Sequence, residues 1–354
     1  SLTNPIQVAS IQTLHVRAVV KEKYGLPECD LLIVDECHRS LGKTYQDIIR
    51  AYPKAVVLGL TATPARSDGR GLGHIYQAMV EAPSERELTK LGFLVPVRHF
   101  VPHLPPKIKI KGDDYDPSEA TAYMDRPALV ADVVETWFKF SKDRQTVVFA
   151  QSVSHSIHLA ERFRQCGIVS AHVDGETQWG DRDRILRGVA DGSVQVVCNF
   201  GVCVEGWDCP PVSTVVGACM TKSLNKYRQM AGRSMRPFDN KTDCIFLDHA
   251  GLVRDHGFVD ADIPWSLDTH GRLHERVKAA REKLPIEIVC PQCSAVFCGK
   301  RCPECGYVYQ RVGSSIDTLD GRLLELRAPK KADEKPTIEE QRRWYAMFRY
   351  QCRV

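Results

Sequence analysis

Two adjacent acids, Asp35 and Glu36, follow directly after the apolar run Leu31–Val34. If that run is a strand, both carboxylates lie at its carboxyl end, the edge at which open α/β sheets bind ligands. One acid placed there can hold Mg²⁺ through water, and its neighbour can orient or deprotonate an attacking water. A strand that ends in a polar turn has the same residues, so the pair alone leaves phosphate chemistry and an ordinary turn equally open.

Small hydroxyl residues follow the next apolar run. Residues 55–60 lead into Thr61-Ala62-Thr63-Pro64, which places two hydroxyls at the same predicted edge. Together, Asp35-Glu36-Cys37-His38 and this threonine segment resemble motifs II and III of the superfamily 2 helicases, the DEAD/DEAH-box class. The resemblance implies that Asp35 and Glu36 are the catalytic pair. It also implies that His38, Thr61 and Thr63 couple the nucleotide site to nucleic-acid binding.

Three later segments extend the resemblance in the expected order. Residues 147–152 with His155 and Ser156 resemble motif IV, Glu205–Pro210 resembles motif V, and Tyr227–Pro237 resembles motif VI, Q-x-x-G-R-x-x-R. The two arginines of motif VI are three residues apart, so on a helix they would share one face and reach one phosphate cluster. The resemblance implies nucleic-acid contacts for one set of residues and nucleotide or catalytic roles for another. The first set is Ser152, His155 and Ser156, and the second is Gly206, Asp208, Gln229, Arg233 and Arg236.

A Walker A loop does not occur in the 354 residues. Gly42-Lys43-Thr44 ends like one, but G-x-x-x-x-G-K-[ST] needs glycine at the position of Cys37. Because that loop holds the β- and γ-phosphates, we expect this chain alone to be inactive as an ATPase. Ile6–Leu14 resembles the stretch just before motif II, so we expect the chain to begin inside the first motor domain. The incomplete sheet should then expose apolar residues.

Four of the 14 cysteines form a compact pattern. Cys290 and Cys293, then Cys302 and Cys305 after eight residues, give two C-x₂-C pairs, the spacing of a tetrahedral structural Zn²⁺ site. A thioredoxin-like redox pair would not need two copies. Cys298, between the pairs, is interpreted as a spectator that could replace a ligand. Contact with DNA and docking of a protein are both open as roles for this predicted zinc ribbon.

The remaining cysteines are scattered through a chain with no signal peptide. Such a chain indicates a reducing, cytoplasmic location, with thiols that act as small buried hydrophobes. No stretch approaches the roughly 18 apolar residues of a membrane span. The formal charge is +4, and residues 271–354 have 17 Lys and Arg against 11 Asp and Glu. A mildly basic end fits a polyanion, although a solvated basic face is the commoner meaning.

Short β-branched runs alternate with amphipathic segments, which predicts an α/β fold with parallel strands buried on both faces. One such run is Ile6–Ala9, and the five strands expected in the second domain are 146–150, 169–173, 194–198, 212–216 and 244–247. We expect two tandem RecA-like domains, the first incomplete at its N-terminal side, plus a Cys₄ zinc ribbon and a helical tail. The predicted boundaries are 1–96 and 97–255 for the two domains, 256–284 for a helical connector, 285–312 for the ribbon, and 313–354 for a linker and C-terminal helix.

The resemblance implies an ATP- and Mg²⁺-dependent helicase or translocase whose partner is DNA, single-stranded or forked, with RNA open as an alternative. A motor subunit of a restriction system and a nucleic-acid-binding or regulatory protein without a P-loop are the other hypotheses. Among superfamily 2 proteins, the chain is most similar to phage- and prophage-type DNA helicases related to type III restriction Res subunits.

Overall fold

The computed structural model describes most of the first 267 residues and four short segments beyond them. The described residues are 4–21, 23, 25–64, 71–102, 108–263, 265–267, 287–289, 296–298, 301, 306–308 and 323–326. The chain divides into two units, residues 1–285 with 311–326, and residues 286–310 with 327–354. The predicted connector helix, the C-terminal helix and the four cysteines of the predicted zinc site lie outside the described residues.

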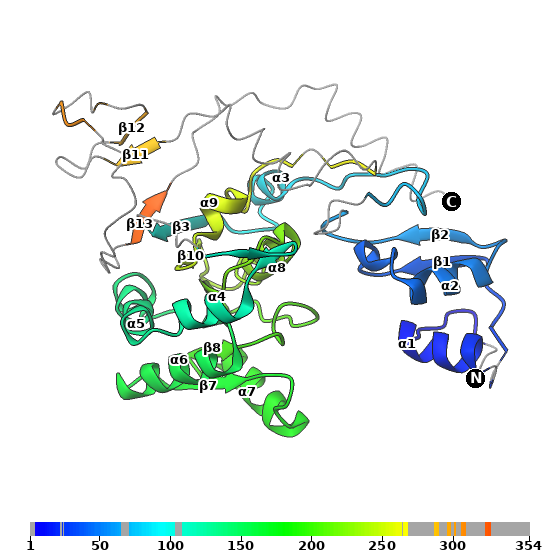
Figure 1. Cartoon of the computed structure of the whole chain (residues 1–354), viewed down its shortest axis with the longest axis horizontal. Helices are drawn as coiled ribbons and strands as arrows, with labels where there is room; N and C mark the ends of the chain where they lie inside the picture. The colour runs from blue at the N-terminus through cyan, green and yellow to red at the C-terminus, as the bar shows by residue number, and fades with distance from the viewer. Residues whose placement is uncertain are drawn as a thin grey trace. The chain divides into compact units, whose positions relative to one another are not determined.

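Helices and strands alternate along most of the chain (Figure 1). The helices are α1 (Ile11–Leu14), α2 (Lys43–Ala51), α3 (Glu85–Lys90), α4 (Pro117–Met124), α5 (Pro127–Ser141), α6 (Val153–Gln165), α7 (Trp179–Asp191), α8 (Leu224–Gly232) and α9 (Leu252–His256), with a π-helical segment at His15–Val20 and a 3₁₀ turn at Cys37–Arg39. The strands are β1 (Leu31–Val34), β2 (Val56–Gly59), β3 (Val97–Pro102), β4 (Ile110–Lys111), β5 (Asp114–Tyr115), β6 (Thr146–Ala150), β7 (Ser170–Val173), β8 (Val196–Asn199), β9 (Thr214–Ala218), β10 (Cys244–Asp248), β11 (Glu287–Val289), β12 (Val296–Cys298) and β13 (Leu323–Leu326).

The larger sheet of the first unit has the strand order β13-β3-β10-β9-β6-β8-β7. Every neighbouring pair is parallel except β13 with β3, which is antiparallel. The parallel strands therefore all end at one edge, and the loops that follow β6, β8 and β7 lie next to each other there. We call this sheet and its helices, residues 85–102 and 108–263, the second lobe.

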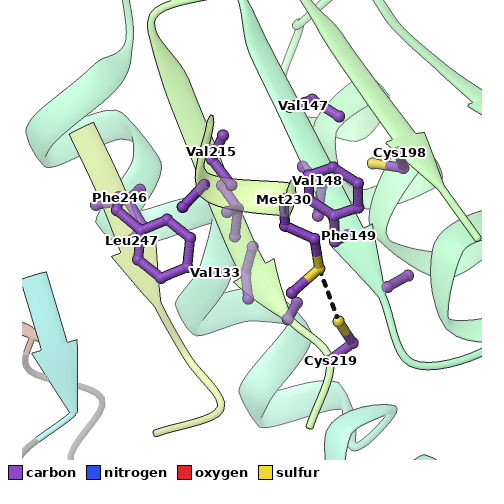
Figure 2. Packing of buried hydrophobic residues seen from close by; sticks show 14 of the residues in the cluster. Val133, Val147, Val148, Phe149, Cys198, Val215, Cys219, Met230, Phe246 and Leu247 are labelled. Carbon is purple, nitrogen blue, oxygen red and sulfur yellow. Dashed lines mark hydrogen bonds between the residues drawn. The ribbon is translucent and has the colours of Figure 1, made fainter. Parts of the chain in front are cut away.

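The strands of the second lobe are buried as the sequence predicts. Every residue of β6, β8, β9 and β10 is buried, because helices such as α5, α6, α8 and α9 pack against the sheet. Figure 2 shows this core, in which Phe149 and Phe246 pack among valines and Cys219 lies 3.5 Å from the sulfur of Met230. Scattered cysteines are buried as expected at positions 37, 198, 203, 209, 219 and 244, whereas Cys29 is half-buried and Cys166 is exposed, contrary to that expectation.

A two-stranded parallel sheet of β1 and β2 forms a separate core with Cys37, Leu72 and Tyr76. We call residues 4–64 and 71–76, which surround it, the first lobe. The register pairs Leu31 with Val56 and places both on the sheet face opposite that core. These two side chains are 51% and 68% exposed, so the predicted exposed apolar surface is present.

The expected strand at residues 6–9 does not form. The segment is not assigned to a strand, and Ile6 and Val8 are almost fully exposed. A strand requires ladder hydrogen bonds to a neighbour, and the described sheet of this lobe pairs only β1 with β2.

Residues before the predicted domain boundary at residue 97 already contact the rest of the second lobe. Glu85 of α3 forms an ion pair with Arg228 of α8, and the Val95 amide donates to the carbonyl of Met235 at 2.8 Å. Val97, the predicted start of the second domain, is the first residue of β3 of the large sheet. The second unit has an antiparallel hairpin of β11 and β12, and Arg301 is bridged to Val308. Within the described residues, no helix has the length and apolar character needed to cross a bilayer.

Candidate nucleotide and nucleic-acid site

Asp35 and Glu36 lie where β1 ends, as the sequence predicts. The Glu36 amide donates to Asp35 Oδ1 at 2.9 Å, which fixes the carboxylate of Asp35 across the turn. Glu36 itself has φ +49° and ψ +46°, the left-handed region that a residue with a Cβ seldom adopts. Such a backbone is retained only where the surrounding structure holds it, and functional sites are where it concentrates.

Burial raises the pKa of Glu36, and the negative charges of Glu205 and Asp35 raise it further. Arg39 and Arg233 act in the opposite direction. The pKa shift moves the carboxylate toward the range in which it can accept a proton from water and still be ionised near neutral pH. Chemically, the turn after β1 can supply one exposed carboxylate for a metal ion and one more basic carboxylate for a water molecule.

His38 connects the acid pair to the neighbouring strand. Its Nδ1 lies 3.2 Å from Glu36 Oε2 and 3.1 Å from Thr61 Oγ1. The same Thr61 hydroxyl accepts from the Thr63 amide at 3.1 Å, so the turn after β2 is joined to the turn after β1. The structure therefore brings together Glu36, His38 and Thr61, three residues whose association the sequence resemblance implied. Thr63 is buried, and its hydroxyl has no hydrogen-bond partner among the described residues.

The motif VI arginines do not share a helical face, which corrects the expectation from their spacing. Helix α8 ends at Gly232, so Arg233 caps it and Arg236 lies beyond it. Both side chains nevertheless reach the motif V loop. Arg233 donates to the carbonyls of Val204, at 2.5 Å, and Trp207, while Arg236 pairs with Asp208. Motif VI therefore holds motif V in this structure.

Two of the motif IV residues are placed in the interior rather than at a surface. His155 is fully buried, its Nδ1 accepts from the Gln151 amide, and burial lowers its pKa to about 4. Ser156 is also fully buried and bonds to His172 Nδ1 at 2.7 Å. Neither can touch nucleic acid, because α6 packs this face onto the sheet. Ser152 begins α6, and its hydroxyl accepts from the His155 amide.

A pocket of about 430 Å³ lies beside these motifs, and it brings His38 of motif II together with Gln229 of motif VI. Its lining residues are His38, Arg39, Val204, Glu205, Ser223, Asn225, Lys226 and Gln229. Gly206, the motif V glycine, has φ +70°, a backbone conformation that favours glycine. The pocket lining includes two cationic side chains, two side-chain amides and the hydroxyl of Ser223, and such groups bind phosphate oxygens.

One pair of functional residues was missed from the sequence. Arg39 Nη2 donates to both carboxylate oxygens of Glu205 at 2.6 Å, and both residues line the pocket. Arg39 follows motif II directly and Glu205 begins motif V, so their positions beside the motifs were the available signal. Their pairing joins segments 166 residues apart, which no local pattern reports.

The described residues supply part of what a Mg²⁺ site requires. Mg²⁺ usually takes only one or two protein carboxylates, with water and substrate phosphates completing its shell. Exposed Asp35 fits that requirement. Among the described ranges there is no cluster of three or more His, Cys, Asp or Glu side chains that could hold a metal ion.

Comparisons with known proteins find two family models. The model of the type III restriction enzyme res subunit matches residues 1–66, and that of the helicase conserved C-terminal domain matches residues 128–237. A 51.5 kDa protein of Lactococcus phage (isolate 7-9) is 30% identical over 309 residues, covering 84% of this chain and 67% of the phage protein. IRC3 of Saccharomyces cerevisiae, named as an ATP-dependent helicase, is 26% identical over 256 residues, covering 69% of this chain and 37% of the yeast protein.

Among solved structures, the chain resembles a fragment assigned as an HsdR subunit of a type I restriction enzyme from Vibrio vulnificus YJ016. The TM-score is 0.53 at 22% identity, and the match covers 68% of this chain and 46% of the fragment. At that identity the likeness shows the fold alone, and it confirms the α/β class with a RecA-like parallel sheet.

Proposed function

Because this chain belongs to the superfamily 2 helicases related to type III restriction Res subunits, we propose that it is part of an ATP-driven DNA helicase or translocase. The observation that carries the proposal is the position of His38, within hydrogen-bond distance of both Glu36 and Thr61. His38 contacts both Glu36, the proposed water-activating acid, and Thr61, at the end of β2. It would therefore link ATP hydrolysis physically to movement of the loop after β2.

In this proposal Asp35 would hold Mg²⁺, which would supply charge neutralisation for the transferred phosphoryl group. Glu36 orients the attacking water and accepts its proton. Gln229, Arg233 and Arg236 face the phosphates from motif VI, and Gly206 and Asp208 complete the nucleotide site from motif V. Ser152 contacts the nucleic-acid backbone, so binding is expected to be salt-sensitive and largely independent of sequence.

The test uses the protein translated from the whole open reading frame that encodes this chain. Glu36→Gln should lower DNA-stimulated ATP hydrolysis by roughly 10²- to 10⁴-fold, with binding of a fluorescent ATP analogue retained. Glu28→Gln changes an exposed acid of the same lobe and is the matched control. Full turnover in the Glu36→Gln protein would contradict the role of Glu36. A wild-type protein that binds DNA without hydrolysing ATP would instead favour a binding or regulatory protein without a P-loop.

A restriction motor is the second candidate, and the match of residues 1–66 to the res subunit model favours it. Such motors translocate on duplex DNA, whereas a helicase separates strands. A protein that displaces a triplex-forming strand from duplex DNA but does not unwind a forked duplex would support the restriction motor. Unwinding of the forked duplex would support the helicase. Repeating both assays with RNA substrates tests the preference for DNA.

The proposed zinc site rests on the residues around the four cysteines. In the sequence, Cys290 and Cys293 lie between β11 and β12, two strands that pair antiparallel. The second pair falls between Arg301 and Val308, which are bridged antiparallel, and Gly306 follows it with φ +74°. Two antiparallel pairings, each with one C-x₂-C pair between its members in the sequence, suit a Cys₄ zinc ribbon.

One Zn²⁺ per chain is expected by elemental analysis. Cys293→Ser and Cys305→Ser should each lower that content, and exposed Cys166→Ser should not. A zinc-free chain whose hairpins remain folded would refute the site. A zinc-dependent partner protein captured only by the metal-loaded chain would support a docking role for the ribbon.

A further inference from the structure

A tryptophan is exposed at the first position of α7. Trp179 is 78% exposed, although tryptophan is among the side chains most buried on average. Phe200, directly after β8, is 39% exposed. Because β7 and β8 are parallel neighbours with Val173 opposite Asn199, the loops bearing these two aromatic residues leave the sheet side by side. The Phe200 amide donates to the Val173 carbonyl at 3.1 Å, which ties them together.

Six side-chain hydrogen bonds hold the loop before Trp179. Asp174 Oδ1 accepts from the amides of Glu176 and Thr177 and from the Thr177 hydroxyl, at 2.8 to 3.0 Å. Arg182 Nη2 donates to the carbonyls of Asp174, Gly175 and Thr177 at 2.9 to 3.2 Å. Trp179 is therefore presented to solvent by a hydrogen-bonded turn, so less backbone entropy is lost when a base stacks on its ring.

The glycines beside the two aromatic residues lie in open space. A Cβ added at Gly175, Gly180 or Gly201 would meet no atom within 4 Å. The exposure of Trp179 and Phe200 leaves their rings accessible to a flat ligand. β6 is the neighbour of β8 on the side away from β7, and the loop after β6 leads to Ser152, the proposed contact with the nucleic-acid backbone. The aromatic pair extends that contact along the same edge of the second lobe.

We infer that Trp179, assisted by Phe200, stacks on bases of single-stranded nucleic acid bound along the carboxyl edge of the second lobe. The inference rests on the proposed function, in which nucleic acid is the partner, and adds that the protein touches bases as well as phosphates. Aromatic stacking is tolerant of sequence because every base has a π-face. A protein partner is the other class of ligand that an exposed tryptophan suits, and the test separates the two.

The experiment measures binding of two 20-nucleotide probes to the full chain by fluorescence anisotropy. One probe is oligo(dT), and the other has the same phosphates with tetrahydrofuran in place of every base. Trp179→Ala should weaken binding of oligo(dT) by roughly 5- to 150-fold, the range for one stacked base. It should leave binding of the abasic probe unchanged, and Trp179→Phe should recover most of the loss.

Phe93→Ala is the matched control, because Phe93 is 65% exposed and precedes β3, at the amino edge of the same sheet. Its affinity for both probes should equal that of the wild type. Equal affinities of wild type and Trp179→Ala for oligo(dT), or an equal loss on both probes, would overturn the stacking role and leave the motor proposal standing. A wild-type chain that binds neither probe would remove nucleic acid as the partner, and the stacking inference with it.

Discussion

Acidification should destabilise the second lobe through two buried histidines. Burial lowers the pKa of His155 to about 4 and that of His99 to about 3, from an ordinary value of 6.5. Both side chains are at most 2% exposed. Each stays neutral in the folded chain, whereas in the unfolded chain it takes up a proton below pH 6.5. The stability that depends on the neutral form is therefore present above pH 6.5 and lost as the pH falls toward 4.

The size of the loss follows from proton linkage. Each histidine that is neutral when folded and charged when unfolded contributes a slope of about 1.4 kcal/mol per pH unit. From pH 7.5 to 5.0, each of the two removes about 2 kcal/mol from the free energy of unfolding, and together they remove about 4 kcal/mol. Domains of ordinary size have only about 5–15 kcal/mol in total, so the effect is measurable.

Urea denaturation at the two pH values provides the assay, with midpoints read from far-UV circular dichroism and tryptophan fluorescence. In His155→Gln the loss between pH 7.5 and 5.0 should be about 2 kcal/mol smaller than in the wild type. His99→Gln should give the same reduction. Comparing each chain with itself at two pH values cancels any pH-independent effect of the substitution.

His74→Gln is the control for the substitution itself, because His74 is exposed. It should leave the urea midpoint at pH 7.5 unchanged. An unaltered pH dependence in both His155→Gln and His99→Gln would refute the reasoning, since it would mean that these rings bind protons equally well when folded. A reduction in one variant only would refute the burial argument for the other residue.

Two substitutions test the packing of the same core. Gly217→Ala should lower the free energy of unfolding by about 1–3 kcal/mol, because the new Cβ would lie 2.9 Å from Leu252 Cδ1 and 3.0 Å from Phe246 Cζ; a midpoint equal to that of the wild type in urea would contradict this. Trp137→Phe should lower it by about 2–4 kcal/mol, because Trp137 is fully buried and its Nε1 donates to Thr146 Oγ1 at 2.8 Å; thermal unfolding followed by circular dichroism measures the change.

Hydrophobic patterning predicted β6 to β10 of the second lobe to within two residues at either end, because these strands are buried in the sheet, and it missed β3, β4 and β5. β6 and β10 have uninterrupted apolar runs because every one of their side chains is enclosed, and such runs are visible in any single sequence. Residues 6–9, Ile-Gln-Val-Ala, were also predicted as a strand and form none. A pattern reports that a side chain prefers burial, and it cannot supply the neighbouring strand whose hydrogen bonds are also required.

Spacing was a poorer guide to side-chain direction in the site. The motif VI arginines looked like neighbours on a helix, but α8 ends at Gly232 before either of them. His155 and Ser156 looked available to ligand, but the helical period that begins at Ser152 turns both inward. Local chemistry suggested what these residues could bind, and only tertiary packing decides what they can reach.

The groups that Arg233 and Arg236 contact suggest how a nucleotide phosphate would bind between motifs V and VI. A guanidinium that is partly buried needs acceptors, and Arg233 and Arg236 take them from the motif V loop. A terminal phosphate that arrives between the motifs would replace Asp208 as the anion beside Arg236, and the arginine would keep a charge-assisted bond throughout. Motif V would at the same time lose a tether to motif VI. In the proposed motor, this exchange would link nucleotide binding to loss of one contact between motifs V and VI, while Arg233 keeps its bonds to Val204 and Trp207.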